Sequence, residues 1–469
     1  MKAVKDFFNL RPNFFKDTEK PIFFDWALLI AISFFMFITF LFWDLSVTGT
    51  HTINYMDAIA HGDILGLYKV NMSVIVDGSL TSVCYDFFIF IFFMIWNIPV
   101  WIIKHLFDIN VMENFYCLLW MKGMLVFFLV LSSVIIKKIC EQIGINRANS
   151  KWAMFIFLSS PLVFSSIFIL CQYDIISITL MLLGILAYIK NQNYRFIFWF
   201  ALAIPLKLFP LFVFIPLLLL KEKRVFFILF KLCNSLYLYF ACRIIESFMP
   251  YHLESTEMFD AQMINKLFQS GITVNLSTAS LFAAIYIIIC AFCYVKNIND
   301  QDELNKYSIY IPFIVYLTFI LIVDYHPQWL IFLTVFFPII LFMNSKHYKA
   351  NILLDMALSA TSLYIISYHF TRCFNEELLN KMFFSKLLPP NLISNSFIYV
   401  RDLISFMKLD NYFSCIHGIF MGLVICLVVL NFPKFNNVKK EVKVERSIIT
   451  SRLLLIVPLI ILIIITYLY

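Results

Sequence analysis

The stretch that decides the fold runs from Cys171 to Arg224 and reads CQYDIISITLMLLGILAYIKNQNYRFIFWFALAIPLKLFPLFVFIPLLLLKEKR. Two polar interruptions, Gln172-Tyr173-Asp174 and Lys207, stand in otherwise apolar sequence, and basic residues cluster at Lys190–Arg195 and Lys221–Arg224. Because Lys and Arg collect in cytoplasmic loops, both basic clusters are expected on the inner side of a membrane. The two polar interruptions are then expected to come to the surface together on the outer side.

The composition of the whole chain supports a membrane location. Of its 469 residues, 62% are hydrophobic and 14% are charged, and the mean hydropathy is +0.87. A soluble domain is about half apolar and about a quarter charged. Repeated apolar runs of about 20 residues predict an all-α integral membrane protein whose main partner is the lipid bilayer. Basic cytoplasmic loops account for the net charge of +7, so no nucleic-acid partner is indicated.

Charge distribution also predicts the topology of a single polytopic domain over residues 1–469. Five basic residues precede the first span, about Phe24–Trp43, and place the N-terminus in the cytoplasm. The next basic loop, Lys137–Lys151, is also expected in the cytoplasm, so an even number of crossings should precede it. Three apolar runs precede it, and one of them therefore does not cross. Phe87–Ile103, which Asn97 and Pro99 interrupt, is expected to be that run and to lie at the membrane interface. The result is about 13 transmembrane helices, a long first outer loop over 44–115, a further outer loop over 371–414 and a basic cytoplasmic loop over 433–452. Single spans are expected over Trp152–Leu170 and Asp174–Ile189, and the span Val225–Ile245 is expected to lead into an outer loop.

The second half of the deciding stretch predicts a short hairpin. Its arms, Phe196–Leu206 and Phe209–Leu220, have about 12 residues each, which span only about 18 Å of a bilayer core. Three prolines interrupt the segment, and basic residues flank both of its ends. Lys207 is therefore expected at the tip of a broken hairpin, on the outer side.

Ionisable and polar side chains at membrane depth are unfavourable, which makes them candidates for function. In the predicted topology they gather near the outer face: Asp44, Asp57, Lys122, Gln172, Asp174, Lys207, His326, Gln328 and Arg372. A carboxylate can take a proton from an attacking hydroxyl, while cations neutralise a phosphate leaving group. This set therefore suits an enzyme that acts on a lipid-linked phosphate.

Several of these residues also have ordinary structural interpretations. Lys122 and Arg372 could instead extend toward the lipid headgroups. Asp57 could be a solvated loop residue, and His326, which precedes a proline, could cap a helix. Asp44 is the favoured catalytic candidate because it follows the first span directly, where headgroups meet water.

Three motifs together resemble polytopic transferases of the GT-C superfamily, especially the bacterial mannosyltransferase-like group and more distantly the GPI mannosyltransferases. The first motif combines Gln172-Tyr173-Asp174 with Gly184, Ala201–Ile204, Lys207, Pro210 and Lys221–Arg224. The second is His326-Pro327-Gln328-Trp329, at the start of a later span, and the third is Asp44 after the first span. The resemblance covers roughly Phe24 to Phe370.

The resemblance implies a GT-C-like fold with membrane-parallel helices in the first outer loop. It also implies inverting transfer of mannose or another hexose from a polyprenyl-phosphate carrier to a glycan or glycolipid acceptor. The active site would be extracytoplasmic, at the cell membrane, and would serve the cell envelope. By position, Asp44 would be the general base, and Lys207 with His326 or Gln328 would lie near the carrier phosphate.

Some alternatives remain open at this level. The first outer loop lacks the paired acidic motif of better-known members, so Asp57 stays an alternative base, and no cofactor or divalent metal is indicated. A flippase or transporter of lipid-linked saccharides would favour ionisable residues at the bilayer midplane and internal repeats, and neither is apparent. A polysaccharide polymerase or ligase would share the outward-facing site.

Overall fold

The computed structural model describes residues 17–41, 44–76, 79–274, 277–369, 405, 407–432 and 442–457. These residues are almost entirely helical. Within them the only sheets are two short antiparallel hairpins: β1 (Val74–Val76) with β2 (Ser79–Thr81), and β3 (Gly271–Val274) with β4 (Ser277–Ser280). Ile75 lies opposite Leu80 in the first hairpin. The all-α class is confirmed.

Within the described residues, five helices are long and apolar enough to cross a membrane. They are α5 (Phe87–Phe107), α6 (Phe115–Gln142), α12 (Val225–Ser247), α15 (Gln301–Ile322) and the run Leu409–Leu430, which contains α21 (Phe413–Leu430). Three bent helix pairs raise the number to eight if each pair is counted as one span. The structure therefore supports a membrane protein, and the figure of 13 crossings stays a prediction.

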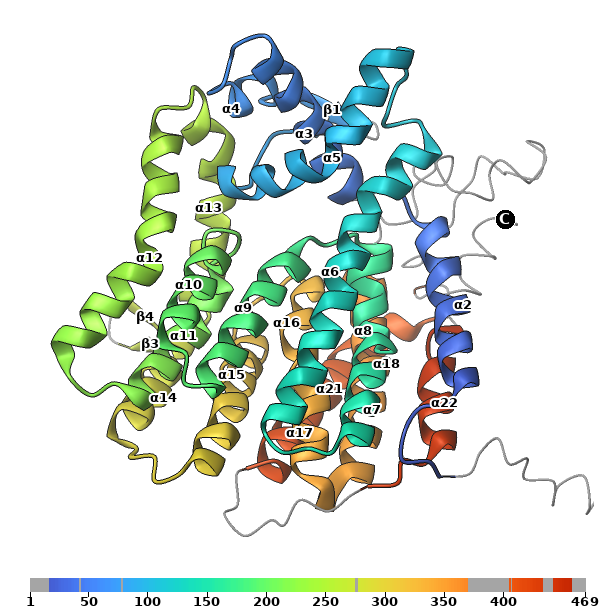
Figure 1. The fold of residues 1–469 in the computed structure, drawn as a ribbon, viewed down its shortest axis with the longest axis vertical. Helices are drawn as coiled ribbons and strands as arrows, with labels where there is room; N and C mark the ends of the chain where they lie inside the picture. Colours follow the sequence, from blue (N-terminus) through green and yellow to red (C-terminus); the bar gives the residue numbers. More distant parts are fainter. Residues whose placement is uncertain are drawn as a thin grey trace, which may run out of the picture.

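One bent pair joins the first apolar helix to a polar helix. Helix α2 (Phe23–Thr39) meets α3 (Asp44–Ala60) at an angle of 58°. Figure 1 shows α3 gathered with α4 (Leu67–Val70), β1 and α5 at one end of the molecule. We call this region, residues 44–107, the cap. It falls within the predicted first outer loop, although α5 is itself long enough to cross a membrane.

Helix α9 (Asp174–Ile189) lies at the centre of the helices below the cap, and every residue of it except Leu183 is buried. Its neighbour α10 (Asn193–Ala203) approaches it closely at Gly184. A Cβ atom at Gly184 would come within 2.6 Å of the ring of Phe200. Only glycine therefore allows α10 to pack this tightly on α9.

Helices α10 and α11 (Phe209–Lys221) form the predicted hairpin. The ring of Phe196 stacks on that of Phe214, with 4.9 Å between their centroids. Lys221, at the end of α11, donates a hydrogen bond of 2.8 Å to the side chain of Asn191, just before α10. The two arms are therefore antiparallel, and the prediction of two short arms joined at Lys207 is confirmed.

Other segments depart from the predicted single spans. The segment predicted as one helix over Trp152–Leu170 divides into α7 (Arg147–Leu158), α8 (Pro161–Val163) and a π-helical turn (Phe164–Ile169), with a bend of 43°. Pro161 lacks an amide hydrogen, which explains the break. The segment predicted as a loop after α12 instead contains helix α13 (His252–Gln269).

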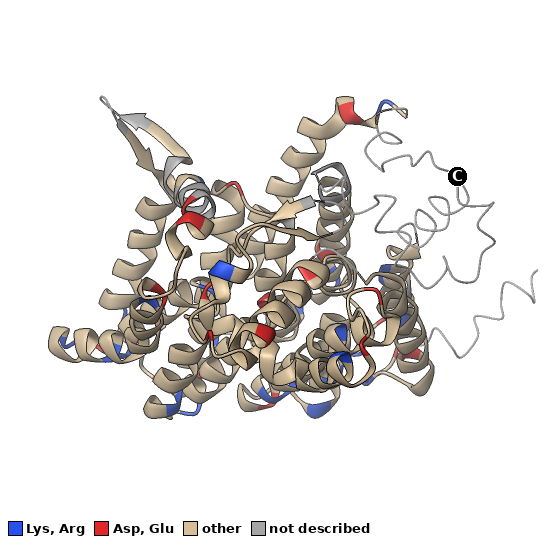
Figure 2. Cartoon of the chain, turned by 90° about the horizontal axis from the view of Figure 1, so that it is seen from above, with Lys and Arg blue, Asp and Glu red and all other residues tan. Residues whose placement is uncertain are grey.

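The remaining helices complete the lower part of Figure 1. They are α14 (Leu281–Val295), α16 (Ile331–Thr334), α17 (Phe337–Met343), α18 (Tyr348–His369), α22 (Arg446–Leu454) and the 3₁₀ turns Pro327–Leu330, Ser345–His347 and Leu409–Tyr412. Viewed from the cap end, the charged residues form small groups between long uncharged stretches (Figure 2). This distribution fits a molecule whose helices face lipid.

Two buried ion pairs fix α22, the last helix of the described residues, to the rest of the chain. Arg446 pairs with Asp25 of α2 at 2.8 Å, and Arg452 pairs with Asp355 of α18 at 2.5 Å. All four side chains are buried. Because each charge has a partner, the pairs can persist in an apolar interior.

Candidate active site

Asp44 begins helix α3, just beyond the apolar helix α2, and is partly buried. The side-chain amide of Gln172 donates a hydrogen bond to Asp44 Oδ2, and the hydroxyl of Tyr85 donates to the same oxygen at 3.4 Å. Burial raises the pKa of Asp44 to about 7, an effect that Lys207 opposes and Asp174 reinforces. A carboxyl group with a pKa near neutrality is well suited to accept and release a proton.

Lys207 lies in the break between α10 and α11, where its ammonium group reaches the start of α9. Its Nζ atom is 3.2 Å from Oδ1 of Asp174, whose carboxylate is fully buried. The same nitrogen lies 5.2 Å from the ring centroid of Tyr173 and 5.9 Å from that of Trp329. An ammonium group held by a carboxylate and aromatic faces has a fixed position, which an anion-binding group requires.

A cavity of about 170 Å³ lies directly beside Lys207. Three cations line it, Lys207, Arg243 and Lys266, against one carboxylate, that of Asp86. The rest of the lining is mainly apolar and aromatic: Leu206, Leu208, Phe209, Phe212, Leu267, Phe319, Val323, Trp329, Tyr85, Tyr173 and Cys84. Each cation is paired with a carboxylate: Lys207 with Asp174, Arg243 with Asp86 and Glu246, and Lys266 with Asp324. An apolar cavity with cationic side chains in its wall suits a ligand that has both a lipid chain and a phosphate.

His326 stands at the edge of this cavity. Its ring centroid is 4.8 Å from that of Trp329, and its Nε2 atom is 3.4 Å from Nζ of Lys266. Burial, followed by the charges of Lys266 and Lys207, lowers the pKa of His326 to about 4. The imidazole is therefore neutral near pH 7 and can act as a hydrogen-bonding group, but it adds no positive charge for a phosphate.

Gln328 lies two residues further on and is buried. The hydroxyl of Ser166 donates to its backbone carbonyl at 3.2 Å. Within the described part of the chain, its side-chain Oε1 has no hydrogen-bond partner. Its Oε1 atom thus has unused hydrogen-bonding capacity, one residue before Trp329 of the cavity lining.

The structure therefore brings together five predicted site residues from separate parts of the chain: Asp44, Gln172, Asp174, Lys207 and His326. Asp57 is elsewhere, about 20 Å further along α3. It accepts hydrogen bonds from Lys104 and from Trp101 of α5, the latter at 2.8 Å. Although burial opposes them, these bonds lower the pKa of Asp57. Asp57 joins two cap helices and does not contact Asp44.

Lys122 also has a structural explanation that is different from the predicted one. Its fully buried ammonium group donates to the backbone carbonyls of Met36, Phe40 and Phe168, the first at 3.0 Å. These carbonyls come from the end of α2 and from the π-helical turn, where the regular helical bonding pattern is broken. Lys122 therefore satisfies carbonyls at two helix breaks. Arg372 lies outside the described residues.

Sequence reasoning missed three residues that line the cavity: Tyr85, Arg243 and Lys266. Arg243 and Glu246 are charged residues one helical turn apart at the end of an apolar helix, and the rarity of such charges could have identified them. Tyr85 and Lys266 occur in segments with no distinguishing pattern. Only the packing of α13 against the cap and α14 brings Lys266 to the site.

The described residues contain no group of three or more His, Cys, Asp or Glu side chains that could hold a metal ion. Cys290 and Cys293 have a Cys-x-x-Cys spacing, but they lie within the apolar helix α14, and both are buried. Asp300 caps helix α15, since its side chain accepts the amide hydrogen of Glu303 at 2.7 Å. These acidic and thiol groups therefore have structural explanations.

No protein-family model, curated protein or solved structure matches this chain. The resemblance to GT-C transferases thus depends on the residues quoted above.

Proposed function

We propose that the protein is an inverting glycosyltransferase that moves a hexose, such as mannose, from a polyprenyl-phosphate carrier to a glycan or glycolipid acceptor. One observation carries the proposal: the carboxyl group of Asp44, with its pKa raised to about 7, is electrostatically coupled to Lys207, which lines the apolar cationic cavity. A proton acceptor and a phosphate-binding cation are the two groups that this transfer needs.

In the proposed reaction, the acceptor hydroxyl oxygen attacks the anomeric carbon of the donor. The bond between that carbon and the phosphate oxygen breaks, and the electron pair leaves with polyprenyl phosphate. The hydroxyl proton passes to the carboxylate of Asp44, and the positive charge of Lys207 stabilises the leaving phosphate. Arg243 and Lys266 line the same cavity, and each is already paired with a carboxylate.

The proposal includes the topology. In a GT-C-like arrangement of about 13 spans, the N-terminus would be cytoplasmic, and the cap and site would be extracytoplasmic at the cell membrane. A polyprenyl-phosphate donor suits this side, because the carrier holds the sugar in the outer leaflet. The apolar wall of the cavity supports a donor with a lipid chain.

The test is transfer of radiolabelled mannose from polyprenyl-phosphate mannose to octyl mannoside by the purified protein in lipid nanodiscs. We expect Asp44→Asn to lower kcat by at least about a thousandfold, in line with the loss of a general base and its electrostatic contribution. Asp57→Asn is the matched control on the same helix and is expected to retain transfer.

A flippase or a polymerase would give different results in the same preparation. Donor movement across the bilayer without loss of the sugar–phosphate bond would favour the flippase. Consumption of a diphosphate-linked oligosaccharide, with polyprenyl-phosphate mannose untouched, would favour the polymerase. Full transfer by Asp44→Asn would remove Asp44 from the mechanism.

A further inference from the structure

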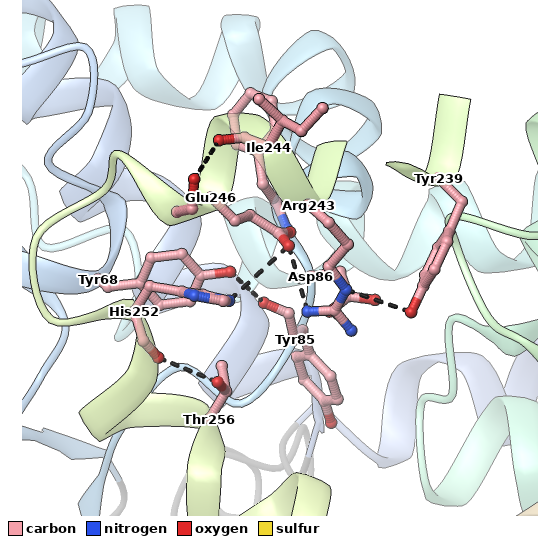
Figure 3. A network of polar contacts seen from close by, with 11 residues as sticks. Tyr68, Tyr85, Asp86, Tyr239, Arg243, Ile244, Glu246, His252 and Thr256 are labelled. Atoms are coloured by element: carbon pink, nitrogen blue, oxygen red, sulfur yellow. Dashed lines mark hydrogen bonds and ion pairs between the residues drawn. The ribbon is translucent and has the colours of Figure 1, made fainter. Parts of the chain in front are cut away.

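The loop between β2 and α5 joins the site to the outer end of α12. Contacts hold three successive residues here, Tyr85 and Asp86 of the loop and Phe87 at the start of α5. Figure 3 shows Tyr85 and Asp86 with their neighbours from α12 and α13. The hydroxyl of Tyr68 donates to the carbonyl of Tyr85 at 3.1 Å, and the amide of Phe87 donates to Oε1 of Glu246 at 2.6 Å. Between them, the carboxylate of Asp86 pairs with Arg243 at 3.0 Å.

Glu246 and Arg243 hold this loop as a pair. The two side chains are 3.2 Å apart on the last turn of α12, and Glu246 is fully buried. His252, at the start of α13, lies 3.7 Å from the same carboxylate. The ring of Tyr68 packs against the imidazole of His252, with 4.8 Å between the ring centroids. A buried carboxylate with these partners strongly resists displacement, because separating it would leave an uncompensated charge.

The loop in turn fixes the side chain of Tyr85. Its hydroxyl donates to Asp44, its ring packs on Tyr173 with 4.9 Å between centroids, and Lys207 lies 6.0 Å from its centre. Tyr85 thus links the α12 network to Asp44. We propose that Glu246 and Arg243 are positioning residues that act on Asp44 through Tyr85.

This inference rests on the proposed transferase function for its kinetic consequence, but its structural consequence can be measured separately. Cys84 precedes Tyr85, lines the same cavity and is partly exposed. The rate at which a membrane-impermeant maleimide modifies Cys84 therefore reports the position of the loop. Mass spectrometry distinguishes Cys84 from the other cysteines.

The variant Glu246→Gln keeps the shape of the side chain and an acceptor for Phe87, but it removes the charge that holds Arg243. We expect modification of Cys84 to accelerate at least about threefold, and kcat to fall about tenfold with KM for the donor nearly unchanged, because a misplaced base lowers rate more than binding. The control is Asp355→Asn, which alters a buried ion pair with no contact to the loop. It is expected to change neither measurement, even if it lowers the melting temperature.

The pH profile separates positioning from general destabilisation. Asp44 is faced by Lys207, Asp174, Gln172, Tyr85 and Tyr173. The Tyr85 hydrogen bond lowers the pKa of Asp44, so its loss in Glu246→Gln should move the acid limb of kcat to higher pH. Tyr85→Phe should move the limb in the same direction, and Asp355→Asn should leave it in place.

The outcomes are distinct. Unchanged Cys84 modification in both Glu246→Gln and Arg243→Gln, in protein that retains the wild-type melting temperature, would overturn the inference. If the wild-type protein transfers mannose, a kcat and a pH profile of Glu246→Gln equal to those of the wild type would also overturn the inference. If the wild-type protein transfers no sugar but Glu246→Gln still exposes Cys84, the proposed function fails while the structural link between α12 and Tyr85 stands.

Discussion

Replacing Asp44 by Asn should make the protein more stable at high pH while abolishing transfer. A pKa of about 7 in place of 3.8 means that ionising Asp44 costs the folded protein about 4 kcal/mol more than it costs the unfolded chain. Asparagine has no charge to desolvate and can still interact with Gln172 and Tyr85. We therefore expect Asp44→Asn to raise the melting temperature at pH 8 by several degrees.

The pH dependence fixes the sign of this effect. An unfolded Asp ionises near pH 4, whereas folded Asp44 ionises near pH 7. The advantage of the variant should be fully present above about pH 7, shrink as the pH falls, and vanish below about pH 4. Thermal unfolding in detergent at pH 8, 6 and 4, followed by tryptophan fluorescence, measures it.

Asp57→Asn is the matched comparison on the same helix, with the opposite sign. Hydrogen bonds from the α5 side chains lower the pKa of Asp57, so its ionised form stabilises the fold above about pH 4. The variant should lower the melting temperature at pH 8 and have less effect as the pH falls. If Asp44→Asn destabilised the protein at pH 8 as Asp57→Asn does, the burial argument for Asp44 would be refuted.

Three further predictions concern catalysis and two lysines. The transfer rate of the wild-type protein should fall about tenfold for each pH unit below about 7, because only ionised Asp44 accepts a proton; a flat rate between pH 5 and 8 would contradict this assignment. Lys207→Met should raise KM for polyprenyl-phosphate mannose about thirtyfold, the effect of removing one member of a buried charged contact. Lys122→Met should instead lower the melting temperature and leave KM unchanged, because Lys122 contacts backbone carbonyls and not the cavity. A rise in KM for Lys122→Met equal to that for Lys207→Met would contradict this division of roles.

Sequence reasoning was most accurate where one physical constraint acts alone. The bounds predicted for α9 match the structure, because apolar sequence between polar flanks leaves few alternatives. The two arms around Lys207 were also predicted correctly, since their length and prolines exclude a straight span. It was less accurate after α12, where a helix of moderate polarity, α13, was interpreted as a loop.

The candidate site was predicted in part for the same reason. Asp44, Asp174 and Lys207 interrupt apolar sequence, and charge at membrane depth is rare enough to be noticed in one sequence. Asp57 has the same local appearance, and only the position of α5 shows that its carboxylate is already bound by Trp101 and Lys104.

The sequence by itself determined that this is a helical membrane protein with a broken hairpin and with polar groups that interrupt apolar sequence. Hydrophobicity, length and proline act locally, so they can be evaluated from neighbouring residues alone. The tertiary structure alone decided which polar groups meet. It placed Asp44 against Gln172 and Tyr85, paired Asp174 with Lys207, and brought Arg243 and Lys266 to one cavity. These contacts join residues far apart in the chain, and their geometry depends on how whole helices pack.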